Sequence, residues 1–377
     1  MKGKQGLVCM GLLLVLSSCH TGKQITASGL QRKDFQTEVN GQHTDLFTLS
    51  NKQGMEVCIT NYGARVVSIL VPDRNGKRED VVCGFSTITE YMEQRQNFGS
   101  TVGRYIGRIL NARFTLDGVE YKLVPNNGKS GHISHGGNPG FADRIWKVEQ
   151  ADTHRVRLSY LSPDGENGFP GNLKVTLVYS LGEDDNALDL TYEATTDAPT
   201  VLNLSHHSFF NISGNFPKSV GDQQLWVDAD RFTPYDDKKC VTGEYLPVAG
   251  TPLDFRMPHT IGECIDADHP QLKVVNGYDH TWELNTKGDD TRPAAWVYDP
   301  ASGRKMEIFT TEPGMQIYTG NGLKGKMTGK GGIAYPFRSA VCFETMHFQD
   351  SPNQPGFPST VLRPGEVFRS HTVYKFE

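Results

Sequence analysis

The sequence predicts an all-β protein built as one large antiparallel β-sandwich. Apolar and polar residues alternate with period two wherever a pattern is clear, as expected for strands with one buried face. An Asp-Gly pair at the centre of one alternating segment indicates a tight hairpin, and 40 glycines and 20 prolines indicate many turns. No internal repeat and no linker rich in proline and glycine divides the 377 residues, so one domain is expected to occupy most of the chain.

The N-terminus has the pattern of a bacterial export signal. Lys2 and Lys4 precede an apolar run over residues 7–16, which is too short to span a bilayer as a stable helix. The run ends in Leu16-Ser-Ser-Cys19, which resembles the lipobox of bacterial lipoproteins, where the cysteine becomes the lipid-bearing first residue. The alternative is an ordinary secretory signal in which Cys19 is incidental.

These features divide the chain into three parts. We expect a lipoprotein signal peptide over residues 1–18, a lipidated Cys19 with a flexible polar tether over residues 19–34, and one folded domain over residues 35–377. Acyl chains on Cys19 would anchor the protein in the bacterial cell envelope, because each buried methylene adds about 0.8 kcal/mol. The anchor would lie on the periplasmic side or in the outer membrane.

Strand and turn signals follow one another along this domain. One short helix is expected over residues 87–94. Next comes a hairpin over residues 113–123, whose Asp117-Gly118 pair supplies the positive φ angles of a type I′ turn. Alternating strands are expected over residues 155–161, 173–179 and 188–192, and a second hairpin joins residues 295–298 to residues 305–310.

Composition and missing motifs exclude several classes of protein. A net charge of −5 argues against a nucleic-acid-binding protein, which would normally show a basic face. There is no phosphate-binding G-x-x-x-x-G-K-[ST], no strand-borne G-x-G-x-x-G and no G-x-S-x-G nucleophile elbow. Beyond Cys9 and Cys19 an odd number of cysteines remains, with no C-x-x-C spacing that would indicate zinc or redox chemistry. Cys58, Cys83 and Cys342 lie in apolar runs and are interpreted as core residues.

Candidate chemical groups are polar residues set in apolar or glycine-rich segments: Arg104, Arg108, His135, His206, His207, Asp279, Gln316 and Glu344. Glu344 follows Val-Cys-Phe, and burial in such a strand would raise its pKa from about 4.3, as suits a general base. A buried arginine such as Arg108 could hold it ionised. The alternative is a carboxylate on the solvent face of an edge strand, and spacing alone does not separate the two.

The three candidate histidines are expected to have different roles. His206 and His207 are adjacent, so in a strand their side chains point to opposite faces and only one can line a given pocket. One would be structural, and the other could donate a proton near neutral pH. His135 precedes two glycines that would let a ligand approach closely. No spacing offers three converging metal ligands, so no metal site is predicted.

Taken in order, these segments resemble those of the aldose 1-epimerases, also called galactose mutarotases. Gly103-Arg-x-x-Gly-Arg108-Ile resembles the family's G-R-x-x-N-R-I, Ser134-His-Gly-Gly resembles L-H-G-G, and residues 203–211 resemble N-L-T-N-H-[ST]-Y-F-N. Further segments that look like the family's are residues 276–280, 311–321, 343–345 and 362–366. Each motif alone is weak, but their common order, from about Thr44 to Glu377, is specific.

The resemblance implies the galactose mutarotase-like supersandwich fold and a role for each matching residue. Glu344 matches the catalytic base and His207 the catalytic acid. The matches to residues that hold the sugar hydroxyls are Arg108, His135, Asp279 and Gln316, with Gly107 beside them. Three positions depart from the pattern: Gly107 and His206 replace asparagines, and Phe209 replaces a tyrosine. The changes at Gly107 and Phe209 remove possible sugar hydrogen bonds, which puts the preferred sugar in doubt more than the reaction.

The implied activity is interconversion of the α and β anomers of free hexoses such as glucose and galactose. Glu344 would take the proton of the C1 hydroxyl while His207 protonates the ring oxygen, and reclosure would give either anomer. This chemistry requires no cofactor and no metal. The expected partners are a monosaccharide and, through Cys19, a membrane, with no nucleic acid, and the chain is expected to be a monomer.

Three alternatives stay open. A glycoside hydrolase could use Glu344 and Asp279 as paired carboxylates about 5–9.5 Å apart. A non-catalytic envelope sugar-binding lipoprotein would keep aromatic platforms such as Trp282 but would not need the His207 and Glu344 pair. A hexose-6-phosphate 1-epimerase would need an additional basic cluster for the phosphate.

Overall fold

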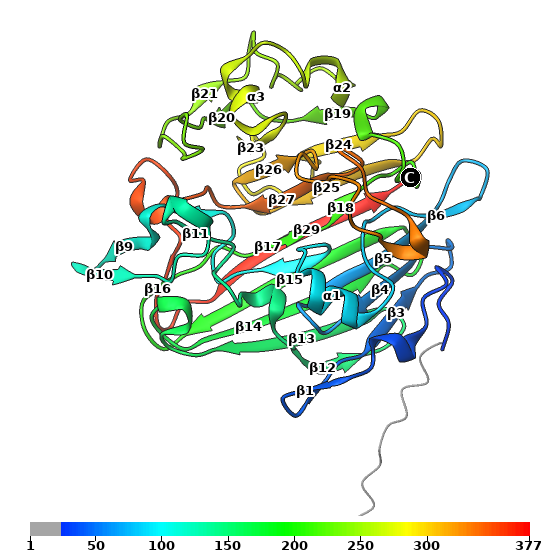
Figure 1. Ribbon diagram of the computed structural model, residues 1–377, viewed down its shortest axis with the longest axis horizontal. Helices are drawn as coiled ribbons and strands as arrows, with labels where there is room; N and C mark the ends of the chain where they lie inside the picture. Colours follow the sequence, from blue (N-terminus) through cyan, green and yellow to red (C-terminus); the bar gives the residue numbers. More distant parts are fainter. Residues whose placement is uncertain (1–23) are drawn as a thin grey trace, which may run out of the picture.

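The longest alternating segments of the sequence pair side by side in one antiparallel sheet. The computed structural model describes residues 24–377 and gives this sheet nine strands. They run from β12 near the bottom of Figure 1 to β19 near the top, with β22 paired beyond β19. The predicted alternation is confirmed. Along β14 every second side chain is buried from Leu173 onward, and along β13 Val156, Leu158 and Ser162 are buried while Tyr160 is half-buried. In sheet order the strands are β12 (Lys147–Ala151), β13 (Arg155–Ser162), β14 (Leu173–Leu181), β15 (Ala187–Thr196), β29 (Phe368–Phe376), β25 (Lys305–Thr310), β24 (Ala295–Tyr298), β19 (Gln224–Val227) and β22 (His259–Thr260).

A six-stranded and a four-stranded antiparallel sheet cover the inner face of this large sheet. The six-stranded sheet consists of β18 (Phe209–Phe210), β27 (Val341–Met346), β26 (Gly314–Tyr318), β23 (Asp279–Glu283), β20 (Arg231–Thr233) and β21 (Leu246–Pro247). The four-stranded sheet consists of β3 (Leu46–Ser50), β4 (Glu56–Thr60), β5 (Arg65–Pro72) and β6 (Arg78–Asp80). Sheet packed on sheet is the predicted β-sandwich.

The main core lies between the layers. Val57 and Ile69 of the four-stranded sheet share one buried apolar cluster with Leu177 of the nine-stranded sheet and Phe343 of the six-stranded sheet. Two tyrosines also connect the layers. The Tyr179 hydroxyl donates to the carbonyl of Ala64 at 2.7 Å, and the Tyr374 hydroxyl donates to that of Phe343 at 3.0 Å. These buried hydrogen bonds fix how the sheets sit on one another.

Outside the three large sheets the chain forms short strand pairs, short α-helices and 3-10 turns. The pairs are β1 (Glu38–Val39) with β2 (Gln42–His43), β7 (Ser100–Val102) with β17 (Ser205–His207), β8 (Arg108–Ile109) with β11 (Ile133–Ser134), β9 (Arg113–Leu116) with β10 (Val119–Lys122), and β16 (Thr200–Val201) with β28 (Val361–Leu362). The α-helices are α1 (Ile88–Gln94), α2 (Ile261–Cys264) and α3 (Pro270–Val275). The 3-10 turns are η1 (Arg32–Phe35), η2 (Leu110–Ala112), η3 (Gly128–Ser130), η4 (Phe141–Asp143), η5 (Glu166–Gly168), η6 (Val220–Asp222), η7 (Lys330–Gly332) and η8 (Ser351–Asn353).

The local predictions are confirmed in three places. Helix α1 begins after Thr87, whose side chain forms a capping box with Glu90. Strands β9 and β10 form the expected hairpin, with φ angles of 51° at Asp117 and 81° at Gly118. Strands β24 and β25 form the second hairpin. Helices α2 and α3 were not predicted, because each spans too few residues to show a helical period.

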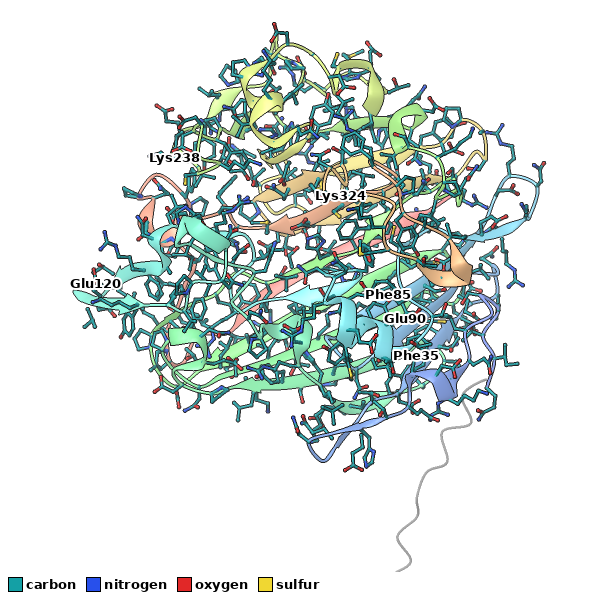
Figure 2. All side chains as sticks on the ribbon, in the orientation of Figure 1. Phe35, Phe85, Glu90, Glu120, Lys238 and Lys324 are labelled. Atoms are coloured by element: carbon teal, nitrogen blue, oxygen red, sulfur yellow. The ribbon has the colours of Figure 1, made fainter. Side chains whose placement is uncertain are left out.

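The structure corrects the predicted start of the folded domain. The tether was expected to reach residue 34, but residues 24–34 already pack against the sandwich. Ile25 forms a bridge with Gln31, and the backbone N–H of Ala27 donates to Glu56 Oε1 at 2.6 Å. Leu30 and Phe35 are buried beside α1, and Figure 2 shows Phe35 close to Phe85 and Glu90. The apolar anchors are too few and too widely spaced to produce a periodic pattern.

The N-terminal segment and the cysteines were also the subject of sequence predictions. The predicted signal peptide and the predicted lipidation site at Cys19 lie outside the described residues. Cys58, Cys83 and Cys342 are buried thiols, as predicted for core residues. Between residues 24 and 377, no helix has the length and apolar character needed to cross a membrane.

Candidate active site

A polar pocket opens where the six-stranded sheet meets β17 and the loops around β8 and β11. The strands that carry its floor, β17, β26 and β27, lie together near the middle of Figure 1. The cavity has a volume of about 250 Å³, which suits a ligand of monosaccharide size rather than a polymer. Its lining residues are Gln96, Asn97, Gly107, Arg108, Ser134, His135, His207, Phe209, Asp279, Gln316, Tyr318, Glu344, Met346 and Gln349. All seven residues predicted for the catalytic and substrate-binding site are among them.

Strand register brings three of these side chains to one face of the sheet. Gln316 on β26 lies directly opposite Glu344 on β27, and Thr281 on β23 lies opposite Gln316. Residues directly opposite one another in adjacent strands point to the same face. Asp279, two residues before Thr281, therefore faces the pocket as well.

The side chains of His206 and His207 point to opposite faces of β17, as predicted. His206 points into the core, where its Nε2 lies 2.7 Å from the hydroxyl of Ser208 and its Nδ1 lies 3.5 Å from that of Tyr179. Burial lowers the pKa of His206 to about 3, so this imidazole is neutral. His207 points the other way and lines the pocket. The histidine that replaces the usual asparagine is thus a core residue and does not contact the ligand site.

His207 and Glu344 face one another at the base of the pocket. His207 Nε2 lies 3.4 Å from Glu344 Oε1, and 7% and 5% of the two side chains are exposed. Burial raises the pKa of Glu344 well above its usual range, and the nearby carboxylate of Asp279 adds to this effect. Burial lowers the pKa of His207, and His135 lowers it further. The pocket thus holds two buried titratable groups within reach of a single ligand.

His135 sits on a strained turn between Ser134 and Gly136. Its φ is 52°, and its ring centre lies 5.6 Å from that of His207. Gly136 is required here, because a Cβ at this position would lie 2.0 Å from the carbonyl oxygen of Gly103. Burial and the charge of Arg108 lower the pKa of His135 to about 4, so it enters the pocket as a neutral imidazole. A neutral imidazole can both donate and accept hydrogen bonds from hydroxyl groups.

Asp279 and Gln316 form a hydrogen-bonded unit. Gln316 Nε2 donates to Asp279 Oδ1 at 2.6 Å, and the Thr281 hydroxyl donates to Gln316 Oε1. Burial raises the pKa of Asp279, while Arg108 and the Gln316 amide partly oppose that rise. The network fixes the Gln316 amide in one orientation and leaves the second oxygen of Asp279 for a ligand.

The predicted support of Glu344 by Arg108 is wrong. Arg108 lies on β8, is half-buried, and donates from Nη1 to the carbonyl of Lys239 at 3.4 Å. Its charge acts on Asp279 and His135, whereas the charge that acts on Glu344 is that of Asp279. Sequence order brought both groups to the pocket but could not show that they lie on different walls.

Several lining residues were not predicted. Tyr318 follows Gln316 by two positions on β26, so the strand period could have revealed it. Gln96 and Asn97 come from a loop, and Gln349 from the turn after β27, where no period exists. No sequence pattern therefore pointed to Gln96, Asn97 or Gln349 as pocket residues.

Three side chains at the base of the pocket also have the types and spacing of possible metal ligands. His207, Cys342 and Glu344 place one ligand atom each within 4.8 Å of one another. The Cys342 thiol is fully buried among apolar residues, and burial raises its pKa well above the usual range. Since metals bind the thiolate, this environment disfavours a metal centre.

The chain is similar to known proteins over most of its length. A family model described as aldose 1-epimerase matches residues 45–375. The galactose mutarotase of Sus scrofa is 39% identical over 330 residues, which cover 88% of this chain and 93% of that protein. The aldose 1-epimerase of Escherichia coli K12 is 36% identical and covers 89% and 96% of the two chains.

Solved structures agree with these sequence matches. The aldose epimerase homologue of C. elegans superimposes with a TM-score of 0.81 at 31% identity, over 89% of this chain and 99% of that one. The galactose 1-epimerase of Lactobacillus acidophilus gives 0.78 at 28% identity, over 90% and 96%. The antiparallel sandwich described above is therefore shared with these proteins.

Proposed function

The chain belongs to the aldose 1-epimerase family and is an isomerase, and we propose from this that its substrates are free galactose and glucose, with Glu344 as base and His207 as acid. The observation that carries the proposal is the contact of 3.4 Å between His207 Nε2 and Glu344 Oε1 in a buried pocket of monosaccharide size. His135, Asp279, Gln316 and Arg108 surround this pair and would hold the sugar hydroxyls.

Ring opening is a transfer of two protons. Glu344 takes the proton of the C1 hydroxyl as the bond from C1 to the ring oxygen breaks, and His207 gives its proton to that oxygen. Rotation about C1–C2 turns the other face of the aldehyde toward the ring hydroxyl. Reclosure with the roles reversed yields the other anomer and returns both groups to their starting states. Protons and electrons balance without a cofactor, so we propose that none is used.

The electrostatics of the pair favour the opening step. Before transfer the pair holds opposite charges, and after transfer both groups are neutral. Burial raises the pKa of Glu344 and lowers that of His207, and both directions favour the neutral state. The contact between His207 and Glu344 stabilises the charged state, from which ring opening starts and to which reclosure returns the pair.

The nearer alternative is a substrate with a 6-phosphate group. Among the lining residues within the described part of the chain, Arg108 is the sole lysine or arginine. A phosphate would normally meet several cationic groups. The composition of the pocket wall therefore favours unphosphorylated hexoses.

Polarimetry tests the proposal on protein that lacks residues 1–19. Freshly dissolved α-galactose, α-glucose and α-glucose 6-phosphate are followed with wild type, Glu344→Gln and His207→Asn. We expect rapid mutarotation of the two free sugars by wild type and a loss of about 10²-fold or more in each variant, the scale of one acid–base group. Glu307→Gln, on a strand outside the pocket, should retain wild-type rates. A folded Glu344→Gln protein that mutarotates at wild-type speed would remove Glu344 from the mechanism.

We also propose that the protein is a lipoprotein of the bacterial cell envelope, anchored through Cys19. The support is the order of charges, apolar run and Leu16-Ser-Ser-Cys19 in the sequence. We propose that it acts as a monomer, since the predicted catalytic and sugar-binding residues all come from one chain.

A further inference from the structure

Gly107 leaves a space in the pocket wall that another side chain fills. The family pattern has an asparagine at this position, so the sequence suggested the loss of a sugar hydrogen bond. A Cβ at position 107 would lie 2.6 Å from Gln349 Cγ, 3.1 Å from its Cδ and 3.3 Å from its Oε1. These three nearest atoms belong to one side chain. Gln349 thus occupies the volume that a side chain at position 107 would need.

The Gln349 amide is held firmly at the pocket wall. Its Nε2 donates to the Tyr235 hydroxyl at 2.6 Å, and its Oε1 accepts from the backbone N–H of Arg108 at 3.3 Å. The turn that carries it is tied to the same region, because the N–H of Asp350 donates to the carbonyl of Arg108 at 2.8 Å. Gln349 is 4% exposed and lines the cavity. Hydrogen bonds and burial therefore fix the Gln349 amide in one position at the pocket wall.

Part of the hydrogen-bonding capacity of this amide remains available. A primary amide has two N–H donors and two acceptor lone pairs. One donor is used by Tyr235 and one lone pair by Arg108. The second N–H is 3.4 Å from Gln316 Oε1, measured from Nε2, which is long enough to be exchanged for a better acceptor.

We propose that Gln349 is a sugar-binding residue that takes over the amide function lost at Gly107. The inference rests on the proposed function of the pocket and names one more residue that sets its affinity and preference for hexoses. Gly107 and Gln349 then form one exchangeable unit, in which the amide comes from the turn after β27 instead of from the loop before β8.

The proposal predicts a specific pattern of single and double substitutions. Gln349→Ala removes the amide, and Gln349→Met removes it while keeping the length of the side chain. Gly107→Asn alone forces the new Cβ into Gln349 and displaces both amides. Gly107→Asn with Gln349→Ala relieves that contact, and asparagine tolerates the φ of 75° at this position better than most residues. The double variant should therefore bind sugar better than either single one.

The experiment measures the Kd for galactose and glucose by calorimetry and kcat and KM by polarimetry. We expect Gln349→Ala and Gln349→Met to raise Kd and KM by about three- to tenfold with little change in kcat, as for one lost neutral hydrogen bond. The double variant should recover most of this loss. Gln354→Ala, in the same turn but outside the pocket, should match wild type and so control for disorder of the turn.

Two results would overturn the proposal. One is a wild-type Kd in folded Gln349→Met, and the other is a double variant whose loss is the product of the two single losses. Failure of the proposed function has a different signature, because wild type itself would then not mutarotate either sugar. The calorimetric comparison of wild type with Gln349→Met remains decisive in that case, since it reports sugar binding directly.

Discussion

At the scale of single residues, Glu344 sets activity against stability. Its carboxyl group is buried at the base of the pocket, 3.4 Å from one imidazole nitrogen, and the like charge of Asp279 also disfavours its ionisation. Burial disfavours the ionised form, which is the form that must accept the sugar proton. The group is therefore poised for catalysis in an environment that costs folding free energy whenever it is ionised.

Glu344→Gln should accordingly stabilise the protein at neutral and alkaline pH. The folded-state pKa of Glu344 is raised above its unfolded value, so the folded state binds more protons in the window above about 4.5. The contribution of Glu344 to stability is fully present below that pH and is lost as pH rises through the folded pKa. We expect a gain of about 1–3 kcal/mol in the variant at pH 8 that shrinks toward pH 4.5, measured by denaturant unfolding.

Glu120→Gln supplies the control for that experiment. Glu120 lies on the exposed hairpin strand β10, and Figure 2 shows it at the edge of the molecule. Its replacement should change stability little at any pH. Parallel pH profiles for wild type and Glu344→Gln would mean that His207 fully compensates the buried charge.

At the scale of elements, a buried arginine connects the loops that shape the pocket. Arg65 on β5 donates to the carbonyls of Gln96 at 2.7 Å, Phe98 at 3.1 Å and Ala142 at 2.7 Å. Its guanidinium also lies 5.4 Å and 5.1 Å from the ring centres of Tyr62 and Tyr91. Gln96 belongs to the pocket wall and Arg65 does not, so Arg65 supports a wall of the site without lining the pocket itself.

Arg65→Lys should weaken sugar binding as well as stability. A lysine carries one compact ammonium group and does not reproduce the planar fork that reaches all three carbonyls. Buried carbonyls left without partners cost about 1–3 kcal/mol each in unfolding free energy. We expect KM to rise several-fold with a smaller change in kcat, because the wall formed by Gln96 and Asn97 loses its support.

Arg304→Lys is the matched control for Arg65→Lys. Arg304 is equally buried and donates to the carbonyls of Val71, Ile212, Ser213 and Lys77, none of which lines the pocket. The control should lose stability but keep the wild-type KM. An equal rise in KM in both variants would show that general loosening of the sandwich, and not support of the pocket wall, changes binding.

At the scale of the whole molecule, the sequence predicts what periodicity and local turn chemistry can encode. Strands β13 to β15 were predicted because one face of each is buried, and the hairpin at Asp117 was predicted because its φ angles need such residues. The predicted pocket residues converge because the family motifs lie on neighbouring strands and loops.

Long-range packing could not be predicted in the same way. The place of residues 24–34 depends on contacts with Glu56 and α1, and the place of Gln349 depends on the missing side chain at Gly107. Arg108 and Glu344 enter the same pocket from different walls, which no spacing along the chain reveals. Each of these outcomes is decided by a partner far away in the sequence.

The lipid proposed at Cys19 would hold the whole molecule at a membrane. If Cys19 carries the lipid, Cys19→Ala should abolish labelling by a fatty-acid probe and release the protein from the membrane fraction, since stable anchoring requires acyl chains. Cys9→Ala is the control, because Cys9 lies in the apolar run that would be removed with the signal. It should be labelled like wild type. The catalytic pocket lies in the folded domain, so kcat/KM in detergent extracts should be equal for all three proteins. Equal labelling of wild type and Cys19→Ala would contradict the anchor at Cys19.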